Sequence, residues 1–414
     1  MKIRFFIMIS VLVVIIAGCS NDESLSISDE EIQNQSFEEI AESAQGETVR
    51  MYMWGGDEGI NQYIDEWVKP KLQETYDVTL ERIPLDTNEI IQKLETEKRA
   101  GQEDGTIDII WMNGENFKRA KEGELLFGPF VDQIPNVEDY YDTESLDFQY
   151  DFGKATEGFE APFGKVQFVF HYDSSKIEEP PATLDELMEW IKQNPGKFTY
   201  PDPRDFTGNT FLRHVLYGKA SSVEKILEEP FSEELAAEES ANVWTYLNDI
   251  APDLWREGQA YPSTLSELDR LYSQGEVWMT MGYNEARGEV LVEDGIFPDT
   301  TESFILEDTG SIGNTHFLSI PYNSPNKEAA LVAIQLMLSP EAQLIKLKPT
   351  YWGENTPIDI DKLDQTKRQD FDSIDRGDTV LEQEHLMETF IPEIDATYVP
   401  WLKEKWIDEV ASEQ

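Results

Sequence analysis

The feature that most constrains the fold is a change of hydrophobic period that repeats between residues 48 and 112. Val49, Met51 and Met53 alternate with other residues, which predicts a strand, and Gly55-Gly56 ends it. The apolar residues from Ile60 to Leu72 then recur at helical spacing. A chain that alternates between extended and helical segments buries both kinds of segment in one layered core.

The same alternation continues through the next segment. The run from Val78 to Ile83 predicts a second strand. Asp86 with Glu89 predicts the start of a helix that ends near Gly101. The apolar run from Ile107 to Met112 is typical of a buried parallel strand. The order β-α-β-α-β places the chain in the α/β class, with a doubly wound sheet.

Strand and helix patterns resume after Pro162-Phe163-Gly164. Val166 to Tyr172 predicts a strand, and Thr183 with Glu186 predicts a capped helix. Trp401, Leu402 and Trp406 predict a docked C-terminal helix over residues 398–410. Two Ser-Pro pairs predict helix starts: Ser324-Pro325 and Ser339-Pro340. Because 414 residues exceed one average domain, we expect two lobes.

The N-terminus has the pattern of an exported lipoprotein. Lys2 and Arg4 precede an apolar run over residues 5–17, which is too short to span a bilayer but suits a signal peptide. Ile16-Ala17-Gly18-Cys19 resembles a bacterial lipobox, in which the Cys is lipidated and becomes the first mature residue. We therefore expect a signal peptide over residues 1–18, and a lipid anchor with a flexible acidic tether over residues 19–46.

The charge balance excludes two classes of partner. The chain has 33 basic and 83 acidic residues, a net charge of −50, which repels nucleic acid and anionic lipid headgroups. This charge does not by itself indicate a cationic ligand, because acidic surfaces also keep secreted proteins hydrated. Cys19 is the only Cys, so we expect no disulfide, no thiol nucleophile and no thiolate metal site.

Motifs of catalysis and metal binding are missing from the sequence. The 4 His residues form no HExxH motif, and neither a G-x-S-x-G elbow nor a Walker A sequence occurs. Asp359, Asp361 and Asp364 lack the Gly and Glu of an EF-hand loop, and Tyr140-Tyr141 lacks a supporting His for ferric iron. We expect a protein that is not an enzyme, without cofactor or metal. An extracellular hydrolase stays as an alternative, because abundant carboxylates make chance pairs unavoidable.

Several segments together resemble the bacterial extracellular solute-binding proteins, the group that includes thiamine, polyamine and maltose binders. The most specific is the helix pair that begins at Ile320-Pro321-Tyr322-Asn323-Ser324-Pro325 and continues to residue 343. Further matching segments are Tyr52 to Gly56, Ile107 to Trp111, Ala161 to Gly164 and Gly275 to Thr280. Residues 51–58 and 63–68 are most similar to the YnjB-like branch.

The resemblance implies a two-lobe periplasmic-binding-protein type II fold, with a hinge and an interlobe cleft. The expected lobes are residues 47–162 plus 306–348, and residues 163–305 plus 349–414. The implied function is that of a substrate-binding lipoprotein of an ABC importer, which captures a small solute and delivers it to permease subunits. We expect an extracytoplasmic monomer, held at the outer face of the cytoplasmic membrane or in the periplasm. A surface lipoprotein that senses a solute or acts as a scaffold stays as an alternative.

Candidate ligand contacts lie mainly at the carboxyl ends of strands, where open α/β sheets bind ligands. Trp54 suits stacking on a ring or a cation, although it also suits a core position. Gly208-Asn209 at a helix start suits an anion. Aromatic residues near carboxylates favour an organic, cationic or heteroaromatic solute such as thiamine; a polyamine or a sugar suits the same residues. The expected contacts are Trp54, Gly55, Gly56, Asp57, Asn113, Glu115, Thr207, Gly208, Asn209, Tyr283, Asn284, Arg287, Asn314, Thr315 and Trp352.

The lipobox interpretation is tested by a Cys19→Ser variant expressed in a bacterial host. We predict that the wild-type protein partitions with membranes and that the variant does not, because Cys19 is the expected lipid acceptor. Membrane fractionation and mass spectrometry of the N-terminus measure this, with Ser20→Ala as the matched control. A membrane-bound C19S protein that is still cleaved before residue 19 would contradict lipidation.

Overall fold

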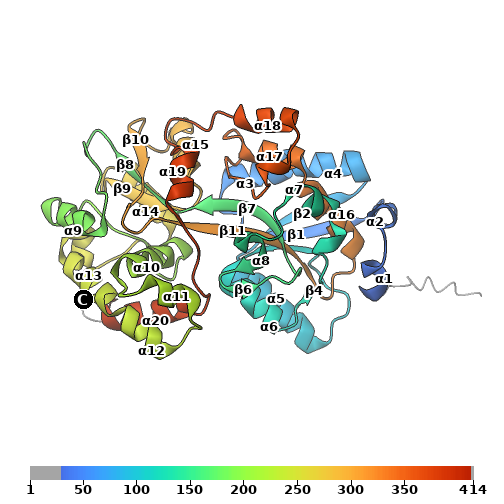
Figure 1. Cartoon of the computed structure of the whole chain (residues 1–414), viewed down its shortest axis with the longest axis horizontal. Coiled ribbons are helices and arrows are strands. Elements are labelled where there is room, and N and C mark those ends of the chain that lie inside the picture. The colour runs from blue at the N-terminus through green and yellow to red at the C-terminus, as the bar shows by residue number, and fades with distance from the viewer. Residues whose placement is uncertain (1–28, 412–414) are drawn as a thin grey trace, which may run out of the picture.

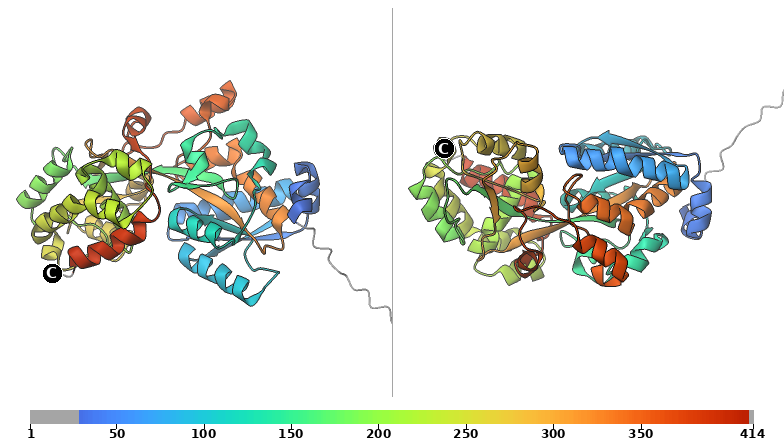
Figure 2. Two further views of the ribbon diagram at one scale, coloured as in Figure 1. Left: turned by 60° about the horizontal axis from the view of Figure 1, so that its bottom comes forward. Right: turned by 90° about the horizontal axis from the view of Figure 1, so that it is seen from above.

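The chain forms two lobes joined by a pair of antiparallel strands (Figure 1). The computed structural model describes residues 29–411. Strand β7 (Ala161–Gln167) runs from lobe 1 to lobe 2, and β11 (Ser311–Pro321) returns beside it. Figure 2 shows from two further directions how this pair connects the lobes. The expected signal peptide, the expected lipid anchor at Cys19 and residues 20–28 of the tether lie outside the described residues.

The main sheet has seven strands, with the order β12-β11-β3-β1-β2, to which β4 and β7 add by pairing with β11. Lobe 1 is built on this sheet except for β12, which pairs with the lobe 2 end of β11. The strands predicted at its centre are confirmed, with β1 parallel to both β2 and β3. Val49, Met51 and Met53 are buried on one face, as their alternation predicts. The remaining strands of this sheet are β1 (Thr48–Met53), β2 (Thr79–Pro84), β3 (Ile109–Met112), β4 (Leu126–Phe127) and β12 (Phe390–Ile391).

Helices cover both faces of the lobe 1 sheet, which explains why its central strands are apolar. The buried helix α16 packs with β1 on one face, while α5 and α6 pack on the other. The predicted end of α5 is confirmed, since Gly101 closes it in the left-handed conformation. The lobe 1 helices are α1 (Asp29–Gln33), α2 (Phe37–Ser43), α3 (Glu58–Gln62), the π-helix η1 (Tyr63–Val68), α4 (Lys69–Tyr76), α5 (Thr87–Ala100), α6 (Gly114–Glu122), α7 (Pro135–Tyr140), α8 (Leu146–Gln149), α16 (Lys327–Met337), α17 (Pro340–Leu347) and α18 (Gln365–Asp372).

Lobe 2 has a three-stranded antiparallel sheet with the order β10-β8-β9, surrounded by helices. The predicted C-terminal helix is confirmed as α20, where Trp406 Nε1 donates to Tyr200 Oη at 3.0 Å. The strands are β8 (Val169–Asp173), β9 (Met279–Gly282) and β10 (Thr301–Phe304), and a separate hairpin in lobe 1 consists of β5 (Tyr150–Asp151) and β6 (Lys154–Ala155). The helices are α9 (Leu184–Gln193), α10 (Phe206–Lys219), α11 (Val223–Glu228), α12 (Glu233–Glu239), α13 (Ala241–Ile250), α14 (Leu265–Ser273), α15 (Arg287–Glu293), α19 (Gln383–Glu388) and α20 (Tyr398–Glu409).

The lobe boundaries differ from the expected ones at two places. Leu306 and Ile312 belong to the lobe 2 core, so the chain returns to lobe 1 along β11 rather than at residue 306. Residues after 348 stay on lobe 1 and cross to lobe 2 only before α19, whose Leu386 packs with Val169 and Ile305. The apolar residues that hold this segment on lobe 1 are too widely spaced to form a periodic pattern: Trp352, Ile358, Leu363 and Phe371.

The tether is folded from residue 29 onward, which corrects the expectation of a flexible segment over residues 19–46. Ile32 and Ile40 are buried in the lobe 1 core, and Asp29 pairs with Lys327 of α16 at 3.1 Å. Ser36 caps α2 and makes a reciprocal capping box with Glu39. Two buried isoleucines and a helix cap therefore hold residues 29–46 against lobe 1, although the acidic composition of this segment predicts a flexible tether.

Four predicted helix starts test the sequence rules directly. Thr183 and Ser339 accept hydrogen bonds from the backbone N–H three residues ahead, so both predicted caps are confirmed. The cap predicted at Ser324 is wrong, because α16 begins after Asn326 and the Ser324 hydroxyl donates to Asp108 Oδ1 at 2.8 Å. Asp86 stands at the start of α5 without a side-chain cap bond.

Within residues 29–411, no single helix is long and apolar enough to cross a membrane. The pair α16 and α17 meets the length and composition test only when both helices are taken together, and it is bent by 60°.

An Ile40→Ala variant tests whether the N-terminal arm is part of the core. Ile40 is fully buried, so we expect the free energy of unfolding to fall by about 2–5 kcal/mol. Thermal denaturation measures the effect, with Glu38→Ala on the exposed face of the same helix as control. An unchanged melting temperature for I40A would mean that the arm is detached in solution.

Candidate functional site

Trp54 follows the last residue of β1 and is 42% exposed, whereas Met51 and Met53 of the same strand are fully buried. Its ring lies 6.4 Å from that of Trp111 at the end of β3. A side chain at Gly56 would collide with the Trp54 ring, so glycine is required where the indole lies. Gly55 accepts a hydrogen bond from Asn61 Nδ2 at 3.0 Å. This loop therefore holds an exposed indole at the edge of lobe 1.

Asp57 lies beside Trp54 and begins α3, where its Oδ1 accepts from Ile60 N at 3.1 Å. Among the described residues, no Lys or Arg lies within ion-pair distance of this carboxylate. Asp57 nevertheless acts across the lobe interface. Burial lowers the pKa of Arg287 of lobe 2, but the carboxylates of Asp269 and Asp57 raise it above the usual value.

Beneath Trp54, three rings form a packed base. The ring of Trp111 lies 4.8 Å from that of His316 and 5.6 Å from that of Trp352, and His316 stacks on Trp352 at an interplanar angle of 9°. Trp352 is buried, so it supports the site rather than offering an exposed surface. Its carbonyl oxygen accepts from Asn284 Nδ2 of lobe 2 at 3.2 Å.

A buried charged cluster, formed by Lys346, Glu354 and His316, lies under this base and against strand β7. Lys346 Nζ donates to Glu354 Oε2 at 2.9 Å and to the Phe163 carbonyl at 2.6 Å. His316 Nε2 lies 2.9 Å from Glu354 Oε1. A side chain at Gly164 would collide with both His316 and Glu354. Burial lowers the pKa of Lys346 while Glu354 raises it. The sequence analysis missed this cluster, and its one signal was Gly164 in the crossing strand.

Asn113 and Asn314 are brought together at the end of β3. Asn113 Nδ2 donates to Asn314 Oδ1 at 2.7 Å, and Asn314 is buried. Thr315 follows on β11 and is half-buried opposite Lys165. The next residue after Asn113 is Gly114, whose backbone N–H donates to Asp151 Oδ2 at 2.6 Å. The predicted loop is thus fixed by two side chains from distant strands.

Glu115 is engaged in the interface between the lobes. Lys403 of α20 pairs with it at 3.0 Å, and Lys118 of the same helix α6 pairs with Asp395 at 3.4 Å. Glu115, which we expected to contact the ligand, thus already has a cation partner. Helix α6 contacts lobe 2 through both pairs.

The predicted anion site at Gly208-Asn209 is wrong. Thr207, Gly208 and Asn209 are buried in the first turn of α10, and Asp205 accepts from the N–H groups of Thr207 and Gly208 at 2.8 and 3.3 Å. A carboxylate of the chain therefore already occupies this helix start. Burial raises the pKa of Asp205, which its hydrogen bonds oppose. Asn209 Nδ2 donates to the Val399 carbonyl at 3.1 Å.

Phe206 is the exposed residue of this turn, and the sequence analysis missed it. It is 45% exposed, and its ring lies 5.5 Å from Tyr283 and 6.5 Å from Phe152 of lobe 1. The signal was Asp205, a capping residue that places the next side chain at the surface end of the helix.

Tyr283, Asn284 and Arg287 lie together after β9 and contact other charged groups. The Tyr283 hydroxyl donates to Glu393, which pairs with the buried Arg213 at 2.9 Å, and burial raises the pKa of Tyr283. Asn284 has a positive φ of 67°, and Arg287 pairs with Asp269. The interface cations Arg213, Arg287, Lys118 and Lys403 thus each have a carboxylate partner.

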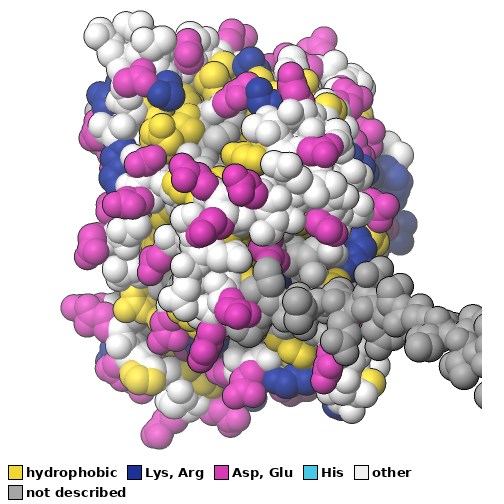
Figure 3. Space-filling model, turned by 90° about the vertical axis from the view of Figure 1, so that its right-hand side faces the viewer, with side chains coloured by type: hydrophobic (Ala, Val, Ile, Leu, Met, Phe, Trp, Pro, Cys, Tyr) yellow, Lys and Arg dark blue, Asp and Glu magenta, His cyan; other side chains and the backbone are white. Residues whose placement is uncertain are grey.

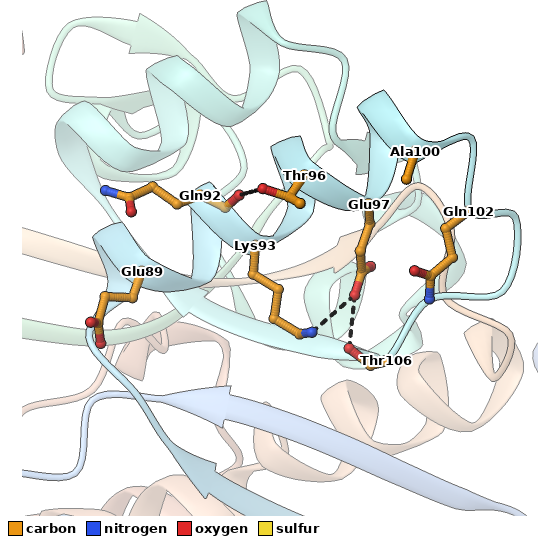
Figure 4. A pocket seen from close by; sticks show the side chains of 8 residues that line it. All are labelled: Glu89, Gln92, Lys93, Thr96, Glu97, Ala100, Gln102 and Thr106. Atoms are coloured by element: carbon orange, nitrogen blue, oxygen red, sulfur yellow. Dashed lines mark hydrogen bonds and ion pairs between the residues drawn. The ribbon is translucent and has the colours of Figure 1, made fainter.

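A concave surface lies on lobe 1 along α5 (Figure 4). It is a groove of about 460 Å³ and is lined by Glu89, Gln92, Lys93, Thr96, Glu97, Ala100, Gln102 and Thr106. Its polar groups bond to one another, since Glu97 Oε1 pairs with Lys93 at 3.2 Å and accepts from Thr106 at 2.9 Å. We therefore place the candidate site between the lobes, where an exposed indole lies beside a carboxylate that has no cation partner in the described part of the chain.

Comparisons with known proteins agree with this arrangement. A family model described as bacterial extracellular solute-binding protein matches residues 66–357. Protein YnjB of Escherichia coli (strain K12) is 36% identical over 339 residues, which cover 81% of this chain and 86% of YnjB. These matches confirm the resemblance that the sequence motifs indicate.

Solved structures of periplasmic binding proteins share the fold. The TpPotD lipoprotein of Treponema pallidum has a TM-score of 0.61 at 15% identity, covering 87% of this chain and 99% of that one. AfuA from Actinobacillus pleuropneumoniae, solved with fructose-6-phosphate, has a TM-score of 0.60 at 14% identity, covering 88% and 98%. At these identities the similarity shows the fold alone, and it confirms the expected two-lobe architecture.

A Lys346→Met variant tests the buried charged cluster. Because it leaves Glu354 buried without its cation, we expect the free energy of unfolding to fall by about 3–5 kcal/mol. Chemical denaturation measures the change. The control is Lys367→Met, whose pair with Asp364 is at the surface and contributes little. Equal effects in the two variants would contradict a supporting role for the cluster.

Proposed function

This chain belongs to the bacterial extracellular solute-binding protein family, and from that premise we propose that it captures a cationic organic solute between its lobes and delivers it to an ABC importer. The family consists of solute-binding proteins of ABC transporters, which bind small solutes outside the cytoplasm and work with permease subunits. These proteins are carriers rather than enzymes. The ligand class, the delivery step and the anchor are our proposals.

The observation that carries the ligand class is an exposed indole beside a carboxylate that pairs with no cation of residues 29–411. Trp54 presents an aromatic face to which a cation is attracted, and Asp57 next to it supplies the compensating charge. Such a pair favours a cation strongly when closing lobes remove water from it, because the interaction is less screened.

The charged groups on lobe 2 also favour a positively charged ligand. Arg213 and Arg287 are both paired with buried carboxylates, so an anionic ligand would have to break an existing pair to gain a cation. Asp205 already occupies the helix start at which an anion would bind. A cationic ligand needs neither pair to break.

Closure would bring the second aromatic surface to the ligand. Phe206 is exposed at the start of α10 and rests on Tyr283, so lobe 2 offers a ring as lobe 1 offers Trp54. A solute that contacts both rings gains interactions only in the closed form and therefore shifts the population of lobe arrangements toward it. Thiamine and polyamines fit this description, since each carries positive charge.

We also propose that Cys19 carries a lipid that anchors the protein outside the cytoplasm, and that the protein acts as a monomer. The lipobox pattern at residues 16–19 supports the anchor. A sensing role would use the same binding event; loss of uptake of the labelled solute after deletion of the gene supports import, and unchanged uptake with loss of a response supports sensing.

The ligand class is tested by titrating the protein with thiamine, spermidine, putrescine, maltose and fructose-6-phosphate. We expect a cation to bind, and to raise the unfolding free energy by about 2.7 kcal/mol at a hundred times its Kd. Trp54→Ala should weaken binding by roughly tenfold, the equivalent of about 1.4 kcal/mol for a lost cation–π contact. Thermal shift and calorimetry measure both effects.

The matched control is Ile407→Ala, which truncates a side chain of similar exposure on the outer surface of α20. It should bind as the wild type does, while Asp57→Asn should weaken the cation. Binding of fructose-6-phosphate or maltose instead of a cation, unaffected by D57N, would refute the proposed ligand class.

A further inference from the structure

Two carboxyl groups are buried together in lobe 1 at the interface with lobe 2. Asp151 is 2% exposed on β5, and Glu160, just before β7, is 1% exposed. Asp151 Oδ2 accepts from Gly114 N at 2.6 Å. Within residues 29–411, Asp151 Oδ1 and both oxygens of Glu160 have no hydrogen-bond partner and do not touch solvent. Carboxylates buried in this way do not remain charged together, because neither is compensated.

Within residues 29–411, neither Asp151 nor Glu160 forms an ion pair, so a proton rather than a cationic side chain is available to neutralise them. Lys121 of α6 is the nearby cation, but its Nζ donates to the carbonyls of Ala155 and Thr156 and pairs with Glu157. On the lobe 2 side the facing group is Glu393, a further carboxylate, which is itself paired with Arg213. Burial raises the pKa of Asp151, and Glu393 raises it further; burial likewise raises the pKa of Glu160, and Asp151 raises it further.

The hairpin that carries Asp151 touches lobe 2 with its next residue. Phe152 is buried with Ala396 and Val399, and its carbonyl accepts from Ala396 N at 3.0 Å. The Arg213 guanidinium lies 5.4 Å from the Phe152 ring. We call these contacts, together with the Lys118–Asp395 and Glu115–Lys403 pairs, the interlobe latch.

We propose that Asp151 and Glu160 bind a proton, and that this proton keeps the interlobe latch engaged. With the proton in place, the β5–β6 hairpin stays packed on residues 396 and 399 of lobe 2. When the proton leaves, Asp151 carries a charge that faces both Glu160 and Glu393, and the repulsion moves the hairpin away from lobe 2. For solute capture, which rests on the proposed function, the consequence is that the balance between lobe arrangements depends on pH.

The direction with pH follows from the raised pKa values. A carboxyl whose pKa is higher in the folded protein contributes stability that is complete below about pH 4, where it is also protonated when unfolded, and that is lost as the pH rises through the folded value. The latch is thus engaged in acid and weakened toward alkaline pH. The neighbouring Lys118–Asp395 pair does not share this transition: burial would raise the pKa of Asp395, but Thr397 and Lys118 lower it.

The test measures the distance between the lobes directly, without a ligand. The mature chain with Cys19→Ser has no other Cys, so spin labels are placed by L146C in lobe 1 and L227C in lobe 2, which are 68% and 41% exposed. Between pH 5 and 9.5 we expect the wild-type background to lose its short distance and gain a longer one. D151N, which removes the charge that faces both Glu160 and Glu393, should keep the short distance over the whole range. E160Q leaves Asp151 opposite Glu393 alone, so it should keep the short distance to a higher pH than the wild type does.

The matched control is E144Q, at an exposed glutamate of lobe 1, which should respond as the wild type does. A wild-type distance that does not change with pH overturns the proposal, as does a pH response in E160Q and D151N that equals that of the wild type. If one variant fails to fold, the interlobe distances of the other variant and of the wild type across the pH range still test the proposal. Because no solute is present, failure here leaves the proposed ligand class untouched, and failure of the titration leaves the latch untouched.

Discussion

The chain crosses between the two lobes along the paired strands β7 and β11 and again before α19, and a buried pair of charges packs against the strand pair at its lobe 1 end. Gly164 has no side chain, so His316 and Glu354 approach the β7 backbone at the point where it leaves lobe 1. Lys346 donates hydrogen bonds both to Glu354 and to the carbonyl of Phe163 in β7. Burying an ammonium and a carboxylate is unfavourable unless both are paired, and here the pairing fixes the crossing segment to the lobe 1 core.

The crossing strands and the candidate site share residues, and this links the crossing between the lobes to the candidate site. His316 contacts Glu354 on one side and the rings of Trp111 and Trp352 on the other. Trp54 rests on Trp111, so the exposed indole is supported by the same packed group that supports the crossing. A movement of β11 therefore cannot leave the base of the site unchanged, because packed side chains transmit displacement.

Charge has to be considered locally in this protein. Acidic side chains are spread over the visible end of lobe 1 (Figure 3), in keeping with the net charge of −50, and such a surface says little about a ligand. At the lobe interface the informative fact is which charges are paired. Arg213 and Arg287 are paired with Glu393 and Asp269, whereas within residues 29–411 Asp57 has only a backbone donor, and neither Asp151 nor Glu160 forms an ion pair. Among the described residues, the interface groups without a charged partner that are named above are thus carboxyl groups.

The sequence by itself determined the elements that depend on neighbours along the chain. The alternation in residues 48–53, the Gly101 helix end and the Thr183 cap are local rules of spacing and hydrogen bonding, and the family motifs are local strings as well. Tertiary structure decided which candidates became surface and which became core. Trp352 is covered by His316, Glu115 is paired with Lys403, and Phe206 is left exposed by the Asp205 cap. These outcomes follow from contacts between residues far apart in the chain, and burial and charge pairing are properties of such contacts rather than of spacing.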